Sequence, residues 1–166
     1  MFNALNGQVE PLSTGQGMVW QYETFAQLST MALYELLRLR VNVFVVEQQC
    51  PYSELDDKDI TAWHLQGFLD GRLVAYARIL PPNELGCPEI GRVIVAPEQR
   101  GSALGHTLMR AAVQHATEAF PSHDIELGAQ AHLQGFYQQQ GFAAVGEPYD
   151  EDGIKHIKMR RANTGR

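Results

Sequence analysis

The sequence predicts an α/β fold, a mixed and mostly antiparallel sheet of about six or seven strands with helices on both faces. In the first half of the chain, strand-like runs follow one another through tight turns, whereas in the second half strands alternate with helical segments. Hairpins build antiparallel pairs, and strand–helix–strand units build parallel pairs with the helix packed on the sheet. The 166 residues suit one domain. We expect that domain over residues 18–162, after a flexible lead-in over residues 1–17.

The first predicted elements are a strand and a helix. Residues 19–25 alternate between apolar and polar side chains, which is typical of a half-buried strand. Ser29 or Thr30 can cap the helix that follows. Its apolar positions recur at helical spacing: Leu33, Leu36, Leu37, Val41 and Phe44. The β-branched residues among 43–46 leave the end of this helix open, and Cys50-Pro51 ends regular structure.

A hairpin and a third strand complete the first half. Residues 64–69 and 72–80 are strand-like, and Asp70-Gly71 between them is a strong two-residue turn signal. Residues 89–96 form the next predicted strand, in which Gly91 indicates a bulge or a close backbone approach.

The second half predicts two helices among three strands. The first helix follows residues 99–105 and has an apolar face made of Leu104, Leu108, Ala111, Ala112 and Ala119. Residues 124–129 form a strand, and residues 131–140 form a helix that Gly141 caps. Residues 142–145 and 156–160 are the last predicted strands, and an acidic loop containing Asp152-Gly153 joins them.

Composition narrows the function. A net charge of -6 and a pI near 5.4 disfavour nucleic-acid binding, which needs clustered Lys and Arg, and suit a cationic partner better. Cys50 and Cys87 form no C-x-x-C pair, so we expect free thiols rather than a disulfide, and the histidines lack ligand spacing, so we expect no metal. The first residues do not match a secretory signal, and no apolar run is long enough for a bilayer. We therefore expect a cytoplasmic protein without a membrane partner.

The most informative segment is the turn at residues 99–105, between a β-branched strand and a helix. Such a turn points backbone N–H groups toward one place beside the positive end of the helix dipole, which suits a pyrophosphate. Gly101 and Gly105 permit close approach, and Arg100 adds positive charge. The P-loop ending G-K-[ST] and the dinucleotide-binding pattern G-x-G-x-x-G are both absent. An ordinary strand–helix turn that contains glycines is the structural alternative.

Two motifs resemble the GNAT superfamily of N-acetyltransferases. Residues 100–105 (RGSALG) are similar to its acetyl-CoA motif R-x-x-G-x-G/A, and residues 136–142 (FYQQQGF) are similar to its following helix and strand. The resemblance extends over residues 21–160 to the ElaA-like branch. Two positions depart from the pattern: Ala103 stands where the motif has its first Gly, and Gln130 where Asn is frequent. Alanine is acceptable there if its φ stays negative.

The resemblance implies a GNAT fold and acetyl-CoA as cosubstrate. It also implies that the pantetheine arm lies along residues 93–95 and that Tyr137 is the general acid near the sulfur, rather than only an aromatic anchor. The implied cofactor-binding residues are Val93, Ile94, Val95, Arg100, Gly101, Ser102, Ala103, Leu104, Gly105, His106, Gln130 and Tyr137.

The general base is open at this point. Glu89 at the start of its strand could act through water, and His64 has a suitable ordinary pKa. Glu47 is a candidate for the acceptor site. Each of the three also has a purely structural interpretation. The acidic residues among 54–59 could attract a cationic amine or form an ordinary solvated loop.

The resulting hypothesis is an acetyl-CoA-dependent N-acetyltransferase that modifies a primary amine of a small molecule or peptide by direct attack. One alternative is a sensor that binds acyl-CoA without turnover. Another is an acyl-homoserine-lactone-type synthase, because residues 38–47 loosely resemble that group. A homodimer is the assembly that the resemblance implies.

Overall fold

An eight-stranded sheet forms the centre of the molecule, with the strand order β1-β2-β3-β4-β5-β8-β6 and with β7 also paired to β8. The computed structural model describes residues 17–164, so almost all of the predicted lead-in lies outside the described residues. The strands are β1 (Met18–Thr24), β2 (Trp63–Leu69), β3 (Arg72–Leu80), β4 (Glu89–Val95), β5 (Ile125–Gln130), β6 (Ala143–Ala144), β7 (Tyr149–Glu151) and β8 (Ile154–Arg161). The helices are α1 (Thr30–Arg40), α2 (Leu104–Ala119) and α3 (Gln134–Gln139), with the π-helix η1 (Val41–Glu47) and the 3-10 turns η2 (Lys58–Thr61), η3 (Pro97–Gln99) and η4 (Ala131–Leu133).

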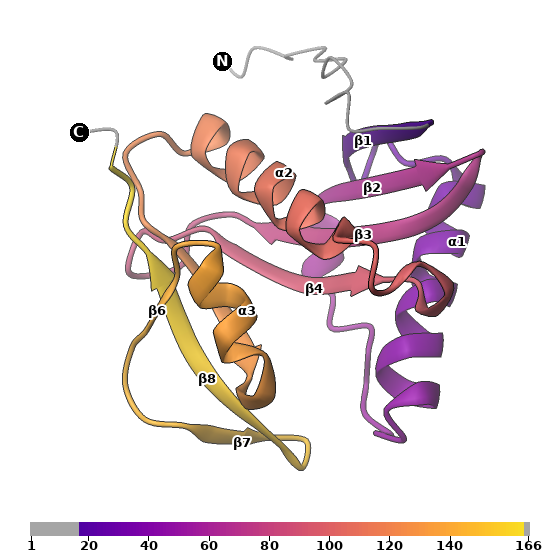
Figure 1. Ribbon diagram of the computed structural model, residues 1–166. Coiled ribbons are helices and arrows are strands. Elements are labelled where there is room, and N and C mark those ends of the chain that lie inside the picture. The colour runs from indigo at the N-terminus through magenta and orange to yellow at the C-terminus, as the bar shows by residue number, and fades with distance from the viewer. Residues whose placement is uncertain (1–16, 165–166) are drawn as a thin grey trace.

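The predicted fold class is confirmed. Among the described strands, β4 and β5 pair in parallel and the other neighbours are antiparallel. Helices α2 and α3 cover one face of the sheet and α1 lies on the other (Figure 1). The larger core lies under α2 and α3, and a smaller core around Leu36, Val43, Tyr76 and Ile94 lies under α1 and η1.

Helix α1 begins and ends for local reasons. The Ser29 hydroxyl accepts a hydrogen bond from the Ala32 N–H at 3.0 Å, as the predicted cap requires. The β-branched run then continues the helix with the wider π spacing, in which Gln48 N–H donates to the Val43 carbonyl at 3.2 Å. Single π turns are frequent at functional sites.

Two turn predictions are confirmed at the backbone. Asp70 and Gly71 have φ values of 49° and 75°, which fit the tight turn between β2 and β3. Gly141 has a φ of 85° and follows α3, where Phe142 N–H donates to the Tyr137 carbonyl and Gly141 N–H to the Gln138 carbonyl. This pair of bonds is the Schellman motif.

Three local predictions need correction. The bulge in β4 lies at Arg92, whose φ is 52°, and not at Gly91. The helix predicted over residues 131–140 is split into η4 and the shorter α3. The predicted acidic loop contains strand β7, because Asp152-Gly153 has left-handed φ values that close a hairpin with β8.

Candidate functional site

The site begins where β4 and β5 separate. Their register contains one pair, Glu89 with Glu126, and beyond it the β4 edge that faces β5 pairs with no described strand. Figure 1 shows β4 and β8, the other neighbour of β5, diverging from the same side of the sheet. A strand edge without a partner presents free N–H and C=O groups to which an extended ligand can add.

The loop after β4 offers a row of backbone donors. The N–H groups of residues 101–105 donate to no acceptor among the described residues. They lie at the N-terminus of α2, which carries the positive end of a 16-residue helix dipole. A Cβ built on Gly101 would meet nothing within 4 Å, so this part of the loop is open to an approaching ligand. The arrangement suits a phosphate group.

Ala103 does not meet the condition of a negative φ under which alanine is readily accepted. Its φ is 61°, in the left-handed region, and it occupies the N-cap position of α2 without a side-chain cap. A left-handed backbone is unfavourable for alanine because its Cβ crowds the following carbonyl. The loop therefore holds Ala103 in the conformation that glycine prefers.

The end of η1 contacts both sides of the opening. Arg100 binds Glu47 through two hydrogen bonds, Nη1 to Oε1 at 2.5 Å and Nη2 to Oε2 at 3.1 Å. The hydrogen bond from Arg100 lowers the pKa of Glu47. Next in the chain, Gln48 accepts a hydrogen bond from Gln130 at 3.1 Å. The structure thus brings the predicted acceptor residue Glu47 next to two predicted cofactor residues.

Tyr137 lies in the larger core close to the opening. Its side chain is buried, its ring lies 5.1 Å from that of Phe136, and its hydroxyl has no hydrogen-bond partner within residues 17–164. Burial raises the pKa of Tyr137 to about 12, so the phenol is protonated at neutral pH. A Cβ on Gly105 would lie 3.4 Å from Phe136 and 3.9 Å from Val95, so α2, α3 and the end of β4 meet here.

The remaining predicted cofactor residues lie around the same loop. The Ser102 hydroxyl donates to the Gln99 carbonyl at 2.6 Å, and His106 Nδ1 lies 2.5 Å from the Gln140 amide nitrogen. Along the strand, Val93 and Val95 pack toward the larger core and Ile94 toward the smaller one, while Leu104 packs on the larger core.

A groove of about 530 Å³ adjoins this loop, between α2 and the end of α3. Arg110 and Arg161 contribute its positive charge, and Arg110 forms no ion pair with a described residue. Sequence reasoning missed both arginines. Their signal was weak, since Arg110 is one exposed position on α2 and Arg161 comes from a strand far along the chain.

Glu89 lies at the closed end of the opening. It starts β4, four residues before Val93, which corresponds to about 13 Å along a strand. It is half-buried and close enough to Tyr149 to help raise the pKa of that phenol, although partial burial is the larger cause. At this separation Glu89 could move a proton from a ligand beside Val93 only through water.

The structure places His64 away from the opening. Its side chain is fully buried, Nδ1 lies 2.7 Å from the Tyr76 hydroxyl, and Nε2 lies 3.0 Å from the Asp59 carbonyl. Burial lowers the pKa of His64. Because both ring nitrogens are engaged, this position disfavours His64 as the base.

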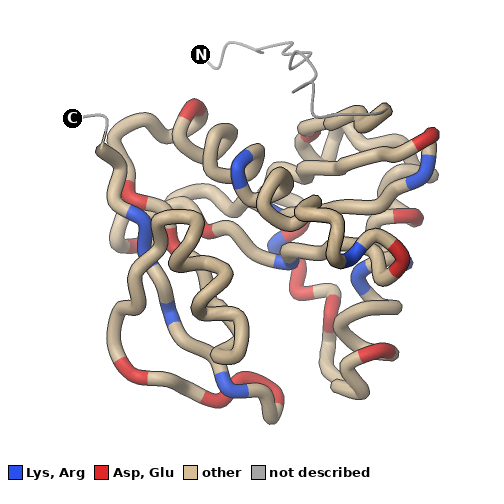
Figure 2. The backbone as a smooth tube through the Cα atoms, in the orientation of Figure 1, with Lys and Arg blue, Asp and Glu red and all other residues tan. Residues whose placement is uncertain are grey.

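The acidic segment 54–59 fits neither of its two sequence interpretations. Its carboxylates bind three arginines of α1, β3 and β4, and in Figure 2 acidic positions of this loop lie against basic positions of the sheet. Burial would raise the pKa of Asp56, but the hydrogen bonds and positive charge of Arg78, together with Lys58 N–H and Arg92, outweigh burial and lower the pKa to about 2. We call this group the arginine–carboxylate network; it contains Arg40, Glu54, Asp56, Asp59, Arg78 and Arg92.

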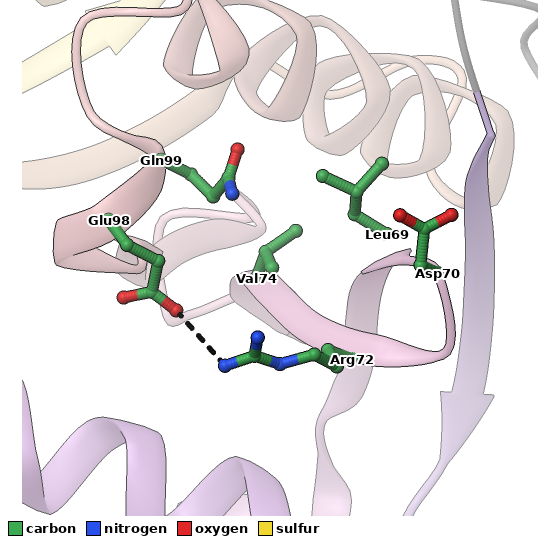
Figure 3. A pocket seen from close by; sticks show the side chains of 6 residues that line it. All are labelled: Leu69, Asp70, Arg72, Val74, Glu98 and Gln99. Carbon is green, nitrogen blue, oxygen red and sulfur yellow. Dashed lines mark ion pairs between the residues drawn. The ribbon is translucent and has the colours of Figure 1, made fainter.

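A second hollow, of about 120 Å³, lies between the β2–β3 turn and η3 (Figure 3). Its dashed contact joins the exposed side chains of Arg72 and Glu98 at 4.0 Å. Ligand pockets usually exceed about 300 Å³, so this hollow is too small for a cofactor. Within the described residues no group of three metal-ligating side chains gathers, and no helix there is long and apolar enough to span a bilayer. Cys50 and Cys87 are both free and buried.

The chain matches the family model described as the acetyltransferase (GNAT) domain over residues 32–162. The chain belongs to the GNAT acetyltransferase family. It is 48% identical over 145 residues to protein ElaA of Escherichia coli K12, covering 86% of this chain and 95% of that protein. The GNAT fold therefore accounts for the separated strands and for the donor-rich loop.

Solved structures give the same family. The crystal structure of E. coli ElaA aligns with a TM-score of 0.83 at 47% identity, covering 87% of this chain and 99% of that one. An acyl-CoA N-acyltransferase from Pseudomonas aeruginosa aligns with a TM-score of 0.84 at 46% identity, covering 88% and 100%. The acyl-homoserine-lactone synthase LasI, at 17% identity and a TM-score of 0.71, shares the fold.

Proposed function

We propose that this protein is an acetyl-CoA-dependent N-acetyltransferase that acts on a primary amine of a small molecule or peptide, with residues 18–162 as its catalytic domain. The observation that carries the proposal is the row of N–H groups over residues 101–105 that have no acceptor within residues 17–164, beside the β4 edge that pairs with no described strand. GNAT family membership and the similarity to an acyl-CoA N-acyltransferase support it.

The residues of the loop and groove fit coenzyme A. The N–H groups of residues 101–105 would hold the pyrophosphate, with Arg100 adding positive charge. The edge at residues 93–95 would hydrogen-bond the pantetheine amides. Arg110 and Arg161 in the groove would meet the phosphate at the adenosine end. When bound, acetyl-CoA supplies an acetyl group activated as a thioester.

Side chains and backbone groups of this chain would then transfer protons and stabilise the developing negative charge. The Tyr137 hydroxyl, protonated and without a hydrogen-bond partner among the described residues, would donate to the sulfur as negative charge develops on it. A backbone N–H among residues 93–95 would donate to the thioester oxygen. An acceptor amine has an ordinary pKa near 10.4, so it must lose a proton before attack, and Glu89 could accept that proton through water.

Calorimetric titration with acetyl-CoA, followed by incubation with a panel of amines, tests the proposal. We expect micromolar binding and, with some of the amines, release of free thiol together with an acetylated product in the mass spectrum. Binding without thiol release from any amine would favour the sensor alternative. Absence of binding would contradict the proposal.

A further inference from the structure

The bulge in β4 is held in an unfavourable conformation. Tyr76 pairs with Ile94 and Arg78 with Gly91, so Arg92 and Val93 together oppose one residue of β3. Arg92 has a φ of 52°, which non-glycine residues rarely adopt without support from their surroundings. Some contact of the Arg92 side chain must therefore favour this geometry.

Glu54 provides that contact. Arg92 Nε lies 2.9 Å from Oε1 and 3.0 Å from Oε2 of the Glu54 carboxylate, whose side chain is 1% exposed. The Arg92 guanidinium also lies 5.9 Å from the centre of the Tyr52 ring and 3.5 Å from Asp56. A charge-assisted bond to a buried carboxylate is stronger than an exposed ion pair.

Glu54 is itself fixed by a second arginine and a tyrosine. Arg40 Nε donates to Glu54 Oε1 at 2.6 Å, and the Arg40 side chain has no exposed surface. The Tyr52 hydroxyl also hydrogen-bonds this carboxylate. Arg40 is the last residue of α1, where η1 begins. One carboxylate thus joins the start of the π-helix to the bulge of β4.

The bulge separates the two parts of β4 that matter for the site. Glu89, before it, is still paired with β5, and residues 93–95, after it, form the unpaired edge. An extra residue bends a strand and increases its twist, so the bulge sets the direction in which this edge leaves β5. Side chains change face there: Ile90 and Val93 pack on the larger core, and Ile94 on the smaller one.

We propose that Arg92 and Glu54 are positioning residues, whose ion pair fixes the bulge and thereby aims the backbone of residues 93–95 at the thioester arm of the cofactor. This inference rests on the proposed function. It assigns the buried carboxylate a role in aligning the reaction as well as in holding the loop to the sheet.

Arg92→Gly is the most informative variant. Glycine accepts a φ of 52° and Glu54 keeps its partner Arg40, so the fold is expected to persist while the tether is lost. Replacing Glu54 would instead leave Arg40 buried without that partner. Asp70→Gly is the matched control, because Asp70 is also left-handed, with a φ of 49°, and lies in the β2–β3 turn.

Amide chemical shifts during a coenzyme A titration separate the two parts of the site. In the wild type and in Asp70→Gly, we expect shifts at residues 101–105 and at residues 93–95. In Arg92→Gly, the shifts at residues 101–105 should persist and the shifts at residues 93–95 should largely disappear. We expect kcat to fall by about 10- to 100-fold, since small misplacements cost that much, and KM for acetyl-CoA to change by less than about threefold.

Two other results would contradict the positioning role of the ion pair or the proposed function itself. If Arg92→Gly keeps both sets of shifts and the wild-type kcat, the ion pair does not position the edge and the inference is overturned. If the wild type shows no cofactor-induced shift at residues 101–105, the proposed function fails and this inference fails with it. Should Arg92→Gly not fold, Arg92→Asn gives the same test, because asparagine tolerates the left-handed region and removes the cation that pairs with Glu54.

Discussion

At the scale of single residues, Arg100 has two competing roles. Its guanidinium is bound to Glu47 across the opening, yet its position in the loop after β4 suits it to the pyrophosphate of a cofactor. Both side chains are partly exposed, 46% for Arg100 and 40% for Glu47, so solvent weakens this ion pair. Under the proposed function, cofactor binding would take Arg100 from Glu47 and leave that carboxylate free to meet an acceptor ammonium.

Glu47→Gln should consequently bind coenzyme A more tightly, by about two- to fivefold, because the competing carboxylate is gone. Calorimetry on both proteins measures this. Glu98→Gln is the control, since it removes one acidic charge from the same region without touching Arg100. Equal gains in the two variants would mean a general charge effect and would refute a competition for Arg100.

Tyr137→Phe should lower kcat on the order of 100-fold and leave coenzyme A affinity unchanged, because only the proton donor is removed. Steady-state thiol release and calorimetry provide the two values. Tyr22→Phe is the control, since that hydroxyl is also buried without a described partner but belongs to β1. Unchanged turnover in Tyr137→Phe would remove Tyr137 from the mechanism.

At the scale of elements, the loop before α2 retains strain where a glycine would have none. Ala103→Gly should raise the free energy of unfolding by about 0.5–1 kcal/mol. The substitution removes the cost of a left-handed alanine, and part of this gain is lost because glycine makes the unfolded chain more flexible. Urea unfolding measures the change. Ala119→Gly, at the exposed end of the same helix, should lower stability. A loss of stability in Ala103→Gly would show that the loop geometry is not strained.

Elements whose signals are local were predictable from the sequence. Asp70-Gly71 and Gly141 carry their own backbone preferences, so the hairpin and the end of α3 follow from neighbouring residues. Arg92 at the bulge hydrogen-bonds Glu54, 38 positions earlier, and Arg40 hydrogen-bonds Asp59, 19 positions later. Sequence periodicity contains no information on such distant partners, so it predicts neither the bulge position at Arg92 nor the ion pairs of the acidic segment.

The donor-rich loop before α2 was predictable from the sequence in the same way. The free donors of residues 101–105 follow from a glycine-containing turn before a helix, which is a local pattern. The groove arginines and the contacts of Glu47 and Gln48 depend on the fold of distant segments, so the sequence alone could not place them.

At the scale of the whole molecule, a buried polar layer joins α1 to the sheet. Burial lowers the pKa of His64 in this layer, and it also lowers the pKa of His115, a residue of α2 outside the layer that stacks on Tyr22. Burial alone would raise the pKa of Asp59, but the hydrogen bonds and charges of Arg40 and Arg78 together outweigh burial, so this pKa is also lowered. In each case the unfolded chain binds protons more readily than the folded one.

Stability should therefore fall as the pH drops. Below the ordinary histidine pKa of 6.5 the unfolded state takes up protons that the folded state refuses, and below about 4 the aspartates add to the loss. Urea unfolding at pH 8, 6 and 5 measures this slope. His115→Phe keeps a ring stacked on Tyr22 and should reduce the slope of stability against pH. His132→Gln, on the surface, should leave that slope unchanged. A free energy of unfolding that does not change with pH would contradict the lowered pKa values of these buried histidines and aspartates.

The most direct test of cofactor binding at the loop before α2 is hydrogen exchange of the backbone amides of residues 101–105, with and without acetyl-CoA. Their N–H groups have no protein acceptor in the described structure, so they should exchange quickly in the free protein. If these N–H groups hold the pyrophosphate, the five amides should be strongly protected from exchange when acetyl-CoA is bound. Binding of acetyl-CoA with unchanged exchange at residues 101–105 would contradict this role of the N–H groups.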